Sequence, residues 1–408
     1  MEIRSTTDRD REVFVDTFHA AFARFPETPA GERTGVWAAL ETDRAWLAVA
    51  PDGRPVGTAA AYSFELTLPG GGLAPVGGVS AVGVLPSHRR QGVLTAMMRH
   101  QFTDVRERGE FLSVLLASEA TIYGRFGYGP ATFTQRLTVP RHRGALTAPR
   151  AGGTGTGTGE DTGSIEVLRR AECGEILEAV YDRYRRAQPG ALSRPPHWWS
   201  LGAGQPPIAP APRYVAVHRD ADGVPDGYAC YSIGEPDSLL VDETIAADDT
   251  VYTALAGFLL NHDLVSEVVF KHSPPENPLR WRLVDLNAGQ LTRHTEWLWV
   301  RILDVPRALT ARGWFCDGEL VLDVDDPFLG ERGRYLLTVR DGKADCVPTD
   351  REPDLSLDVR DLGSVYLGGT APSTLVRAGH IRAHGPDAAA LADALFRAER
   401  PPHCLHWF

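Results

Sequence analysis

The chain has 408 residues, 43% of them hydrophobic, so it is long enough to form two or three domains with sizeable cores. Its formal net charge of −11 argues against a nucleic-acid-binding surface and favours cationic partners. The N-terminal residues lack an apolar signal core, and no stretch is long enough to span a membrane, so we expect a cytoplasmic protein without a membrane partner.

Cysteine and histidine patterns give no sign of a metal site. The five cysteines are widely spaced and form no Cys-x-x-Cys motif, which predicts reduced thiols. His403, Cys404 and His406 lie close together near the C-terminus, but their spacing favours a tail segment over a zinc site. We therefore expect no metal.

The first predicted elements are a helix and two strands. Apolar residues recur at helical spacing in residues 12–24, which predicts an amphipathic helix. Residues 45–50 and 56–68 alternate as strands, and Pro51-Asp52-Gly53 between them has the residues of a hairpin turn. Glycines 70–72 then precede the central part of the domain.

The most informative stretch is residues 79–130. An apolar strand at 79–85 leads through a loop at 86–92 into a helix with one apolar face. The helix start offers unpaired N–H groups, Gly92 allows a phosphate to approach the backbone, and Arg89 and Arg90 add positive charge. This arrangement predicts an anion-binding site.

The rest of the chain divides into a linker and two further domains. Residues 149–163 are rich in Gly and Thr, which predicts a flexible linker after a first domain of residues 1–148. In residues 164–299 the order of predicted elements echoes the first domain, with helices at 175–186 and 252–261 and strands at 214–218, 228–233 and 266–270. This second domain has no Arg-x-x-Gly loop. The third domain, 300–408, is predicted to contain a helix at 306–312, strands at 318–324 and 335–340, and late helices.

Two motifs in the central stretch resemble a known family. Residues 89–94, RRQGVL, resemble the pyrophosphate loop Gln/Arg-x-x-Gly-x-Gly/Ala of the GNAT superfamily of N-acetyltransferases, except at Leu94. Residues 118–130, SEATIYGRFGYGP, are similar to the signature of the Eis-like (enhanced intracellular survival) acetyltransferases. The similarity continues into the third domain and the C-terminus, at residues 296–306, 361–369, 373–375 and Phe408.

The resemblance implies an α/β fold with two tandem GNAT-like domains followed by a sterol-carrier-like domain. It implies acetyl-CoA as cosubstrate, bound by the first domain, while the second domain, without the loop, is expected to bind none. The implied acetyl-CoA contacts come from one strand and the loop after it: Val82, Val84, Arg89, Arg90, Gln91, Gly92, Val93 and Leu94.

The resemblance also implies two catalytic groups. Tyr123 corresponds to the general acid and the C-terminal carboxylate of Phe408 to the proton acceptor. From reference pKa values, a phenol protonates a departing thiolate uphill by roughly 2 kcal/mol, so hydrogen bonding to the thiolate is an alternative to full transfer. A free carboxylate is a weak base that burial strengthens, and a relay through water is equally open. The structural alternatives are a strand-capping tyrosine and an aromatic terminus packed in a core.

Several departures from the family concern the amine acceptor. Aminoglycoside-acetylating members carry acidic residues where this chain has Arg24 and Trp407, and a larger ring where it has Ala81. Trp37 retains an aromatic wall. We expect a less anionic pocket than in those relatives. Two further residues either orient the acceptor or close the turn after a strand: Ser118 and Glu119.

Together these features predict an N-acetyltransferase that acetylates a primary amine of a small molecule, aminoglycoside-like or other, by direct attack in a ternary complex. The resemblance implies a hexamer. A protein, peptide or natural-product N-acyltransferase stays open as an alternative. So does a non-catalytic protein whose C-terminal domain binds a lipid or a partner.

Overall fold

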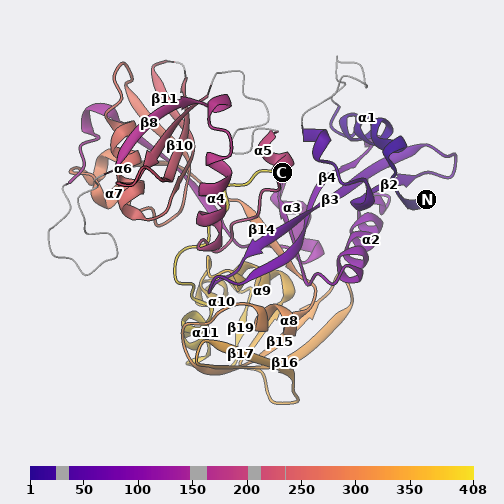
Figure 1. The fold of residues 1–408 in the computed structure, drawn as a ribbon. Helices are drawn as coiled ribbons and strands as arrows, with labels where there is room; N and C mark the ends of the chain where they lie inside the picture. Colours follow the sequence, from indigo (N-terminus) through magenta and orange to yellow (C-terminus); the bar gives the residue numbers. More distant parts are fainter. Residues whose placement is uncertain (24–35, 148–162, 201–212, 235) are drawn as a thin grey trace. The chain divides into compact units, whose positions relative to one another are not determined.

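The computed structural model describes residues 1–23, 36–147, 163–200, 213–234 and 236–408 (Figure 1). These residues form two compact units. The first unit contains Met1–Thr132, Trp297–Pro402 and Phe408, and the second contains Phe133–Glu296 and His403–Trp407. Within the described residues, no helix has both the length and the apolar character that crossing a membrane requires.

The first unit is built around a seven-stranded sheet whose order is β1-β2-β3-β4-β5-β14-β6. Only β4 and β5 are parallel, and helix α2 connects them. The strands are β1 Glu2–Ser5, β2 Ala45–Val49, β3 Pro55–Thr67, β4 Leu73–Val84, β5 Leu112–Leu116, β6 Gly129–Pro130 and β14 Leu298–Ile302.

Helices α1 (Arg11–Ala21) and α2 (Val93–Glu107) cover opposite faces of this sheet (Figure 1). Successive residues of β3 alternate between the two apolar clusters, so that Ala60 packs with Phe14 of α1 while Ala59 packs with Met97 of α2. The period of two in the strand and of 3.6 in the helices thus gives each face its own core. The predicted helix at 12–24 is confirmed, but it ends at Ala21.

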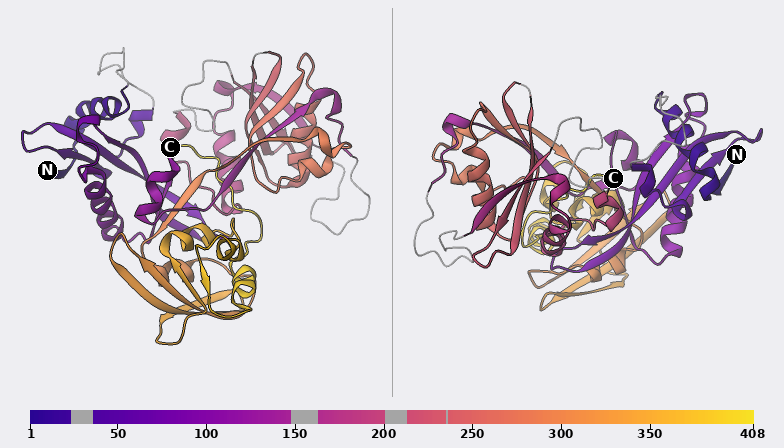
Figure 2. Two further views of the ribbon diagram at one scale, coloured as in Figure 1. Left: turned by 180° about the vertical axis from the view of Figure 1, so that it is seen from behind. Right: turned by 45° about the horizontal axis from the view of Figure 1, so that its top comes forward.

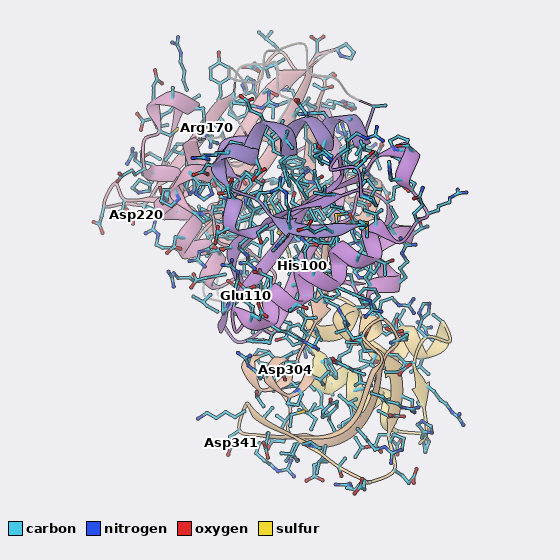
Figure 3. All side chains as sticks on the ribbon, turned by 90° about the vertical axis from the view of Figure 1, so that its right-hand side faces the viewer. His100, Glu110, Arg170, Asp220, Asp304 and Asp341 are labelled. Atoms are coloured by element: carbon cyan, nitrogen blue, oxygen red, sulfur yellow. The ribbon has the colours of Figure 1, made fainter. Side chains whose placement is uncertain are left out.

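A buried ion pair between Arg44 and Glu110 stabilises the end of the connection from α2 to β5. Arg44 precedes β2 and donates to both carboxylate oxygens of Glu110, at 2.8 and 2.7 Å; Glu110 is labelled in Figure 3. Both residues are buried, and a Cβ on Gly77 of β4 would come within 2.8 Å of the Arg44 guanidinium. Glycine at this position leaves room for the pair, whose bidentate geometry stabilises two charges away from water.

The second unit repeats this topology. Its sheet has the order β8-β9-β10-β11-β12-β7-β13 from edge to edge, and only β11 and β12 are parallel. The strands are β7 Phe133–Pro140, β8 Ser164–Arg169, β9 Tyr214–Arg219, β10 Pro225–Gly234, β11 Ser238–Ala246, β12 Glu267–Ser273 and β13 Gln290–Glu296. The helices are α4 Ile176–Arg186, α5 Pro196–Ser200, α6 Asp249–Leu260 and α7 Leu279–Arg282. The prediction that the second domain echoes the first is confirmed.

The two sheets exchange one strand each. The sixth position is held by β14 in the first sheet and by β7 in the second, although β14 follows the second set of strands in the sequence and β7 follows the first. The two sheets therefore do not divide at residues 148 and 299, where the domain boundaries are predicted. The domain boundaries themselves stay predictions. Apart from Gly163, the predicted linker 149–163 lies outside the described residues.

A third sheet, of order β17-β16-β15-β18-β19, belongs to the first unit and is coloured orange to yellow in Figure 2. Its strands are β15 Gly318–Asp326, β16 Glu331–Arg340, β17 Lys343–Pro348, β18 Leu355–Asp358 and β19 Arg382–Ala383. Its helices are α8 Val305–Ala311, α9 Val359–Tyr366, α10 Pro372–Arg377 and α11 Ala388–Phe396.

Helix α9 lies directly on β6 and β14 because glycines remove the side chains between them. A Cβ on Gly129 of β6 would overlap the carbonyl oxygen of Arg360 and the side chain of Ser364. Similarly, a Cβ on Gly363 of α9 would overlap the carbonyl oxygen of Val300. This close approach explains glycines in two of the segments that carry the family resemblance.

Candidate active site

A β-bulge opens the first sheet. Two consecutive residues of β4, Ala81 and Val82, lie opposite the single residue Ala59 of β3. Ala81 has a φ of +50°, which is uncommon for a residue with a side chain. On its other side, β4 pairs with β5 only over residues 77–79. Because a bulge bends its strand, the edge of β4 from residue 80 to 84 separates from β5 and has no strand partner there within the described part of the chain.

The start of α2 presents the predicted anion site. Gly92 is the N-cap residue of the 15-residue helix, with a φ of +81°, and Arg90 in the same loop has a φ of +62°. A Cβ on Gly92 would meet no atom within 4 Å, so the space beside its backbone is open. The helix N-terminus therefore combines free approach with the positive end of the helix dipole.

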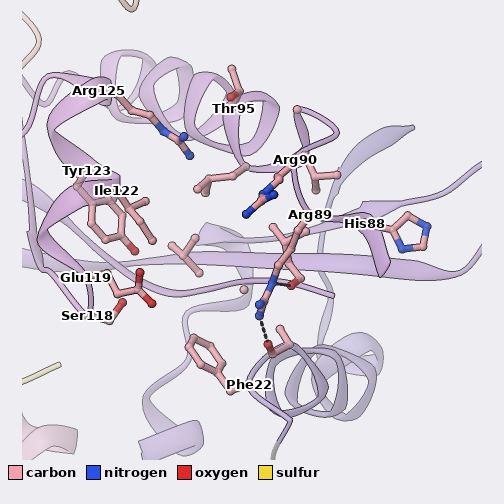
Figure 4. A pocket seen from close by; sticks show the side chains of 17 residues that line it. Phe22, His88, Arg89, Arg90, Thr95, Ser118, Glu119, Ile122, Tyr123 and Arg125 are labelled. Carbon is pink, nitrogen blue, oxygen red and sulfur yellow. Dashed lines mark hydrogen bonds between the residues drawn. The ribbon is translucent and has the colours of Figure 1, made fainter. Parts of the chain in front are cut away.

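A cavity of about 670 Å³ joins this loop to the opening beside β4 (Figure 4). Its size is in the range of small-molecule binding sites. The structure brings ten of the sequence-predicted residues together in its lining: Val82, Val84, Arg89, Arg90, Gly92, Val93, Leu94, Ser118, Glu119 and Tyr123. Gln91 is not among the residues that line the cavity, and its side-chain amide instead donates to the carbonyl oxygen of Ser87 at 3.1 Å.

The arginines of the cavity differ in what they bind. Arg89 donates from Nη2 to the carbonyl oxygen of Ala21 at 2.7 Å and from Nε to that of Val84 at 3.3 Å. Its guanidinium therefore joins the C-terminal end of α1 to β4, where the helix dipole favours positive charge. Arg90 and Arg125 come from different elements, and Figure 4 shows both guanidinium groups directed into the cavity.

Sequence reasoning did not assign a role to Arg125. This residue lies in the turn η6 (Gly124–Phe126), and its guanidinium is 4.8 Å from the ring centroid of Phe126. The sequence feature that could have pointed to Arg125 is its position in the signature 118–130, two residues after Tyr123. Arg90 and Arg125 together make the loop end of the cavity positive on two sides.

Tyr123 ends the short helix α3 (Ala120–Tyr123) and is 7% exposed. Burial raises the pKa of its phenol and the nearby Glu119 carboxylate raises it further, while hydrogen bonding with Ser118 acts in the opposite direction. The phenol therefore stays protonated across the neutral range and is a hydrogen-bond donor. Figure 4 shows its hydroxyl group on the side of Ser118 and Glu119.

The neighbouring Tyr128 has a different environment. It is fully buried, its hydroxyl group lies 2.8 Å from Ser113 Oγ, and burial raises its pKa. Its ring packs edge-on against Tyr123, with 6.2 Å between centroids. Tyr128 is not among the cavity-lining residues, so we assign it a packing role.

Phe408 packs on the α1 face of the sheet, beside β4. Its ring centroid lies 5.0 Å from that of Phe64 and 6.5 Å from that of Tyr62. A Cβ on Gly78 would come within 3.0 Å of the Phe408 ring, three residues before Ala81 in the bulge. Phe408 is 7% exposed and is not among the described residues that line the cavity. Its catalytic role stays a prediction.

The other described acceptor residues, Trp37, Ala81 and Trp407, are not among the residues that line the cavity. Trp37 packs against α1, with its ring centroid 5.0 Å from that of Phe18, and Ala81 faces the same apolar cluster. Trp407 is 44% exposed and belongs to the second unit. Arg24 lies outside the described residues. Among the described residues that line the cavity, Glu119 alone has a carboxylate.

The corresponding helix start in the second unit carries its own anion. Asp248 caps α6, and its carboxylate accepts hydrogen bonds from the backbone N–H groups of Thr250 and Val251 at 2.8 and 3.0 Å. A phosphate approaching this helix start would meet a carboxylate that already occupies the N–H groups. This favours the prediction that the second domain binds no coenzyme A.

Ion pairs lie at the equivalent position in the second sheet. Pairing of β11 with β12 ends at Val241, just before a register shift at Asp242. Asp242 forms ion pairs with Arg213 and Lys271, at 2.6 and 2.5 Å. The next residue, Glu243, is buried and pairs with Arg194 at 2.8 Å. Charged side chains are thus buried where the pairing of β11 with β12 ends, at the position that corresponds to the opening in the first sheet.

Comparison with known proteins agrees with this geometry. The family model described as an acetyltransferase (GNAT) domain matches residues 2–131, a second model with the same description matches residues 190–302, and a sterol carrier protein domain matches residues 305–405. The N-acetyltransferase Eis of Mycobacterium tuberculosis is 34% identical over 94% of this chain and 94% of its own length. An uncharacterized N-acetyltransferase of Streptomyces avermitilis is 34% identical over 100% of this chain and 99% of its own.

Solved structures extend the similarity to the whole chain. The crystal structure of Eis1 from Mycobacterium abscessus is 34% identical, covers 100% of both chains and has a TM-score of 0.86. A GCN5-related N-acetyltransferase from Anabaena variabilis, 19% identical over 100% of both chains, shares the fold with a TM-score of 0.83. The predicted fold class, two GNAT-like domains followed by a sterol-carrier-like domain, is confirmed. The chain belongs to the Eis-like N-acetyltransferases of the GNAT superfamily.

Proposed function

We propose that this N-acetyltransferase transfers the acetyl group of acetyl-CoA to a primary amine of a small molecule, by direct attack in a ternary complex. The observation that carries the proposal is the cavity that runs from the start of α2, past the free edge of β4, to Tyr123 and Glu119. It has a positive end, a strand edge without a strand partner among the described residues, and an acidic end.

The residues at the positive end suit the phosphates of coenzyme A. Arg90 and Arg125 supply charge, and the backbone at Gly92 is open to close approach. Along the free edge of β4, the backbone groups of Val82 and Val84 are placed to hydrogen-bond an extended amide-containing arm, as an added strand would. One Val84 group, the carbonyl oxygen, already accepts from Arg89, so Arg89 serves to hold α1 against β4 more than to bind phosphate.

The transfer forms one C–N bond and breaks one C–S bond. The ammonium nitrogen loses two protons overall, of which one is taken up at sulfur and the other passes to the base and then to solvent. Tyr123 donates its O–H to the sulfur, and because its pKa is raised, hydrogen bonding to the developing thiolate carries more of this role than full proton transfer. The carboxylate of Phe408 accepts the proton from the amine, directly or through water. Backbone N–H groups at the bulge polarise the carbonyl.

Glu119 suggests the acceptor. A primary alkylammonium carries its charge at pH 7, and the Glu119 carboxylate in the cavity lining would attract it towards Tyr123. With one side-chain carboxylate, the described part of the lining suits an amine of low positive charge better than a polycationic antibiotic. An amine on a protein, peptide or natural product would meet the same chemistry.

The test is an acceptor screen. Purified protein is incubated with acetyl-CoA and a panel of amines of one to five positive charges, and thiol release and product mass are measured. We expect a gain of one acetyl group on small amines. Acetylation of a protein or peptide alone would support the alternative acceptor, and binding of fatty ligands without thiol release or coenzyme A affinity would refute enzyme action on acetyl-CoA.

Two further properties belong to the same proposal. An acetyl-CoA-dependent enzyme is expected where its cosubstrate is made, in the cytoplasm, and cell fractionation tests this. Assembly into a hexamer, implied by the family resemblance, is tested by analytical ultracentrifugation, where a monomer or dimer would contradict it.

A further inference from the structure

The bulge in β4 is held from both faces of the sheet. From the α1 face, Thr58 of β3 donates its hydroxyl to the carbonyl oxygen of Ala81 at 2.8 Å. From the other face, Gln101 of α2 donates its Nε2–H to the carbonyl oxygen of Ala60 at 3.0 Å. Both carbonyl groups border the register shift, where the regular ladder of backbone hydrogen bonds is disrupted.

Both donors are polar side chains in apolar surroundings. Thr58 and Gln101 each have 0% exposure. Gln101 lies on the buried face of α2, next to Phe102 and near Met97 and Met98 in an otherwise apolar row. A polar side chain at such a place is unfavourable unless its hydrogen bonds are made. The bonds from Thr58 Oγ1 and Gln101 Nε2 go to the backbone of the bulge, while Gln101 Oε1 has no hydrogen-bond partner among the described residues.

We propose that Thr58 and Gln101 are positioning residues that keep β4 in its bulged conformation. They hold the positive φ of Ala81 and thereby present the backbone of Val82 to the thioester. This inference rests on the proposed function, in which the acyl group lies at the bulge. Without the two donors, β4 gains freedom to straighten and the gap beside β5 narrows.

The chain offers a matched set of variants. Thr58→Val removes the hydroxyl and keeps the shape, while Thr58→Ser keeps the hydroxyl. Thr67→Val is the control, because Thr67 lies on the same strand with 0% exposure, far from the bulge, and its hydroxyl has no hydrogen-bond partner among the described residues. Gln101→Met removes the second donor independently.

In Thr58→Val and Gln101→Met we expect kcat to fall about ten- to a hundredfold, because small misplacements of a reacting group have effects of this size. Binding of 3′-phosphoadenosine 5′-diphosphate, which reports on the loop end of the cavity, should stay unchanged. Thr58→Ser and Thr67→Val should keep wild-type kcat. All variants are assayed below their unfolding temperatures, so that a loss of stability alone does not lower kcat.

Hydrogen exchange gives a readout that needs no turnover. Peptides covering residues 79–85 should exchange faster in Thr58→Val than in Thr67→Val, with no difference in the peptides of α2. If Thr58→Val folds and shows normal kcat and unaltered exchange, the inference is overturned. If Thr58→Val does not fold, normal kcat and unaltered exchange in Gln101→Met would overturn it instead. A wild-type protein without acetyl transfer refutes the proposed function, while the exchange experiment still decides on the bulge.

Discussion

Replacing Gly92 by alanine separates backbone strain from ligand binding at the start of α2. The glycine has a φ of +81°, which costs an alanine about 1 kcal/mol of folding free energy. No atom lies within 4 Å of the Cβ position, so no steric clash adds to this cost. In the proposed complex, however, the new methyl group stands where a phosphate approaches the backbone.

Gly109 at the other end of α2 provides the matched control. It has a φ of +74°, is also exposed, and its Cβ position is likewise free of neighbours within 4 Å. Gly109→Ala therefore imposes the same strain away from the cavity. By chemical denaturation we expect both variants to lose about 1 kcal/mol of stability.

Acetyl-CoA affinity should distinguish the two variants. Loss of a hydrogen bond to a charged group amounts to about 1.5–3 kcal/mol, so the Kd of Gly92→Ala should rise about ten- to a hundredfold. Titration calorimetry should show wild-type affinity for Gly109→Ala. Equal weakening in both variants, or wild-type affinity in Gly92→Ala, would refute the assignment of the helix start as the phosphate site.

Three further predictions test other parts of the site, and a fourth tests the pH dependence of stability. Tyr123→Phe should lower kcat about a hundredfold at unchanged acetyl-CoA affinity, because the donor is lost, and wild-type kcat would leave the phenol only a packing role. A Gly-Ser extension after Phe408 should abolish turnover but not acetyl-CoA binding, whereas the same extension at the exposed N-terminus should be silent; turnover in the C-terminally extended protein would remove Phe408 from the mechanism. Arg125→Gln should raise the acetyl-CoA Kd about tenfold, Arg125→Lys should restore part of the affinity, and an unchanged Kd in Arg125→Gln would exclude a phosphate contact. Burial lowers the pKa of His403 to about 3 and of His272 to about 4, so both imidazoles stay neutral in the folded protein at pH values where they are protonated in the unfolded chain. The protein therefore keeps its full stability above pH 6.5 and loses stability as the pH falls from 6.5 towards 4. Each histidine should cost about 2 kcal/mol by pH 5, and a denaturation midpoint in His403→Asn as acid-sensitive as in the wild type would contradict this.

Local elements were predicted well because their signals are local. The loop before α2 carries Gly92 and its arginines within a few residues, and apolar spacing in the helix after it needs no distant partner. The prediction missed β11 (Ser238–Ala246), the central strand of the second sheet, since Asp242 and Glu243 interrupt its apolar pattern. Those acids are tolerated because buried arginines pair with them, and the pairs come from distant segments.

The candidate site was predicted in part. Ten predicted residues line one cavity, because the strand, loop and signature carry them close together in the chain. The bonding of Arg89 could not be predicted, since its partner Ala21 lies 68 residues away on another helix. The same is true of Phe408, whose place beside Phe64 depends on how the C-terminus returns to the sheet.

By itself, the sequence determined many of the helices and strands and the family to which the chain belongs, and it predicted where an anion binds, because periodicity, glycine positions and charged motifs act over short distances. Tertiary structure alone decided that β14 and β7 exchange sheets and that Thr58 and Gln101 meet at one bulge. The physical reason is that a strand's pattern specifies a buried face but not the neighbour that satisfies its hydrogen-bonding edge.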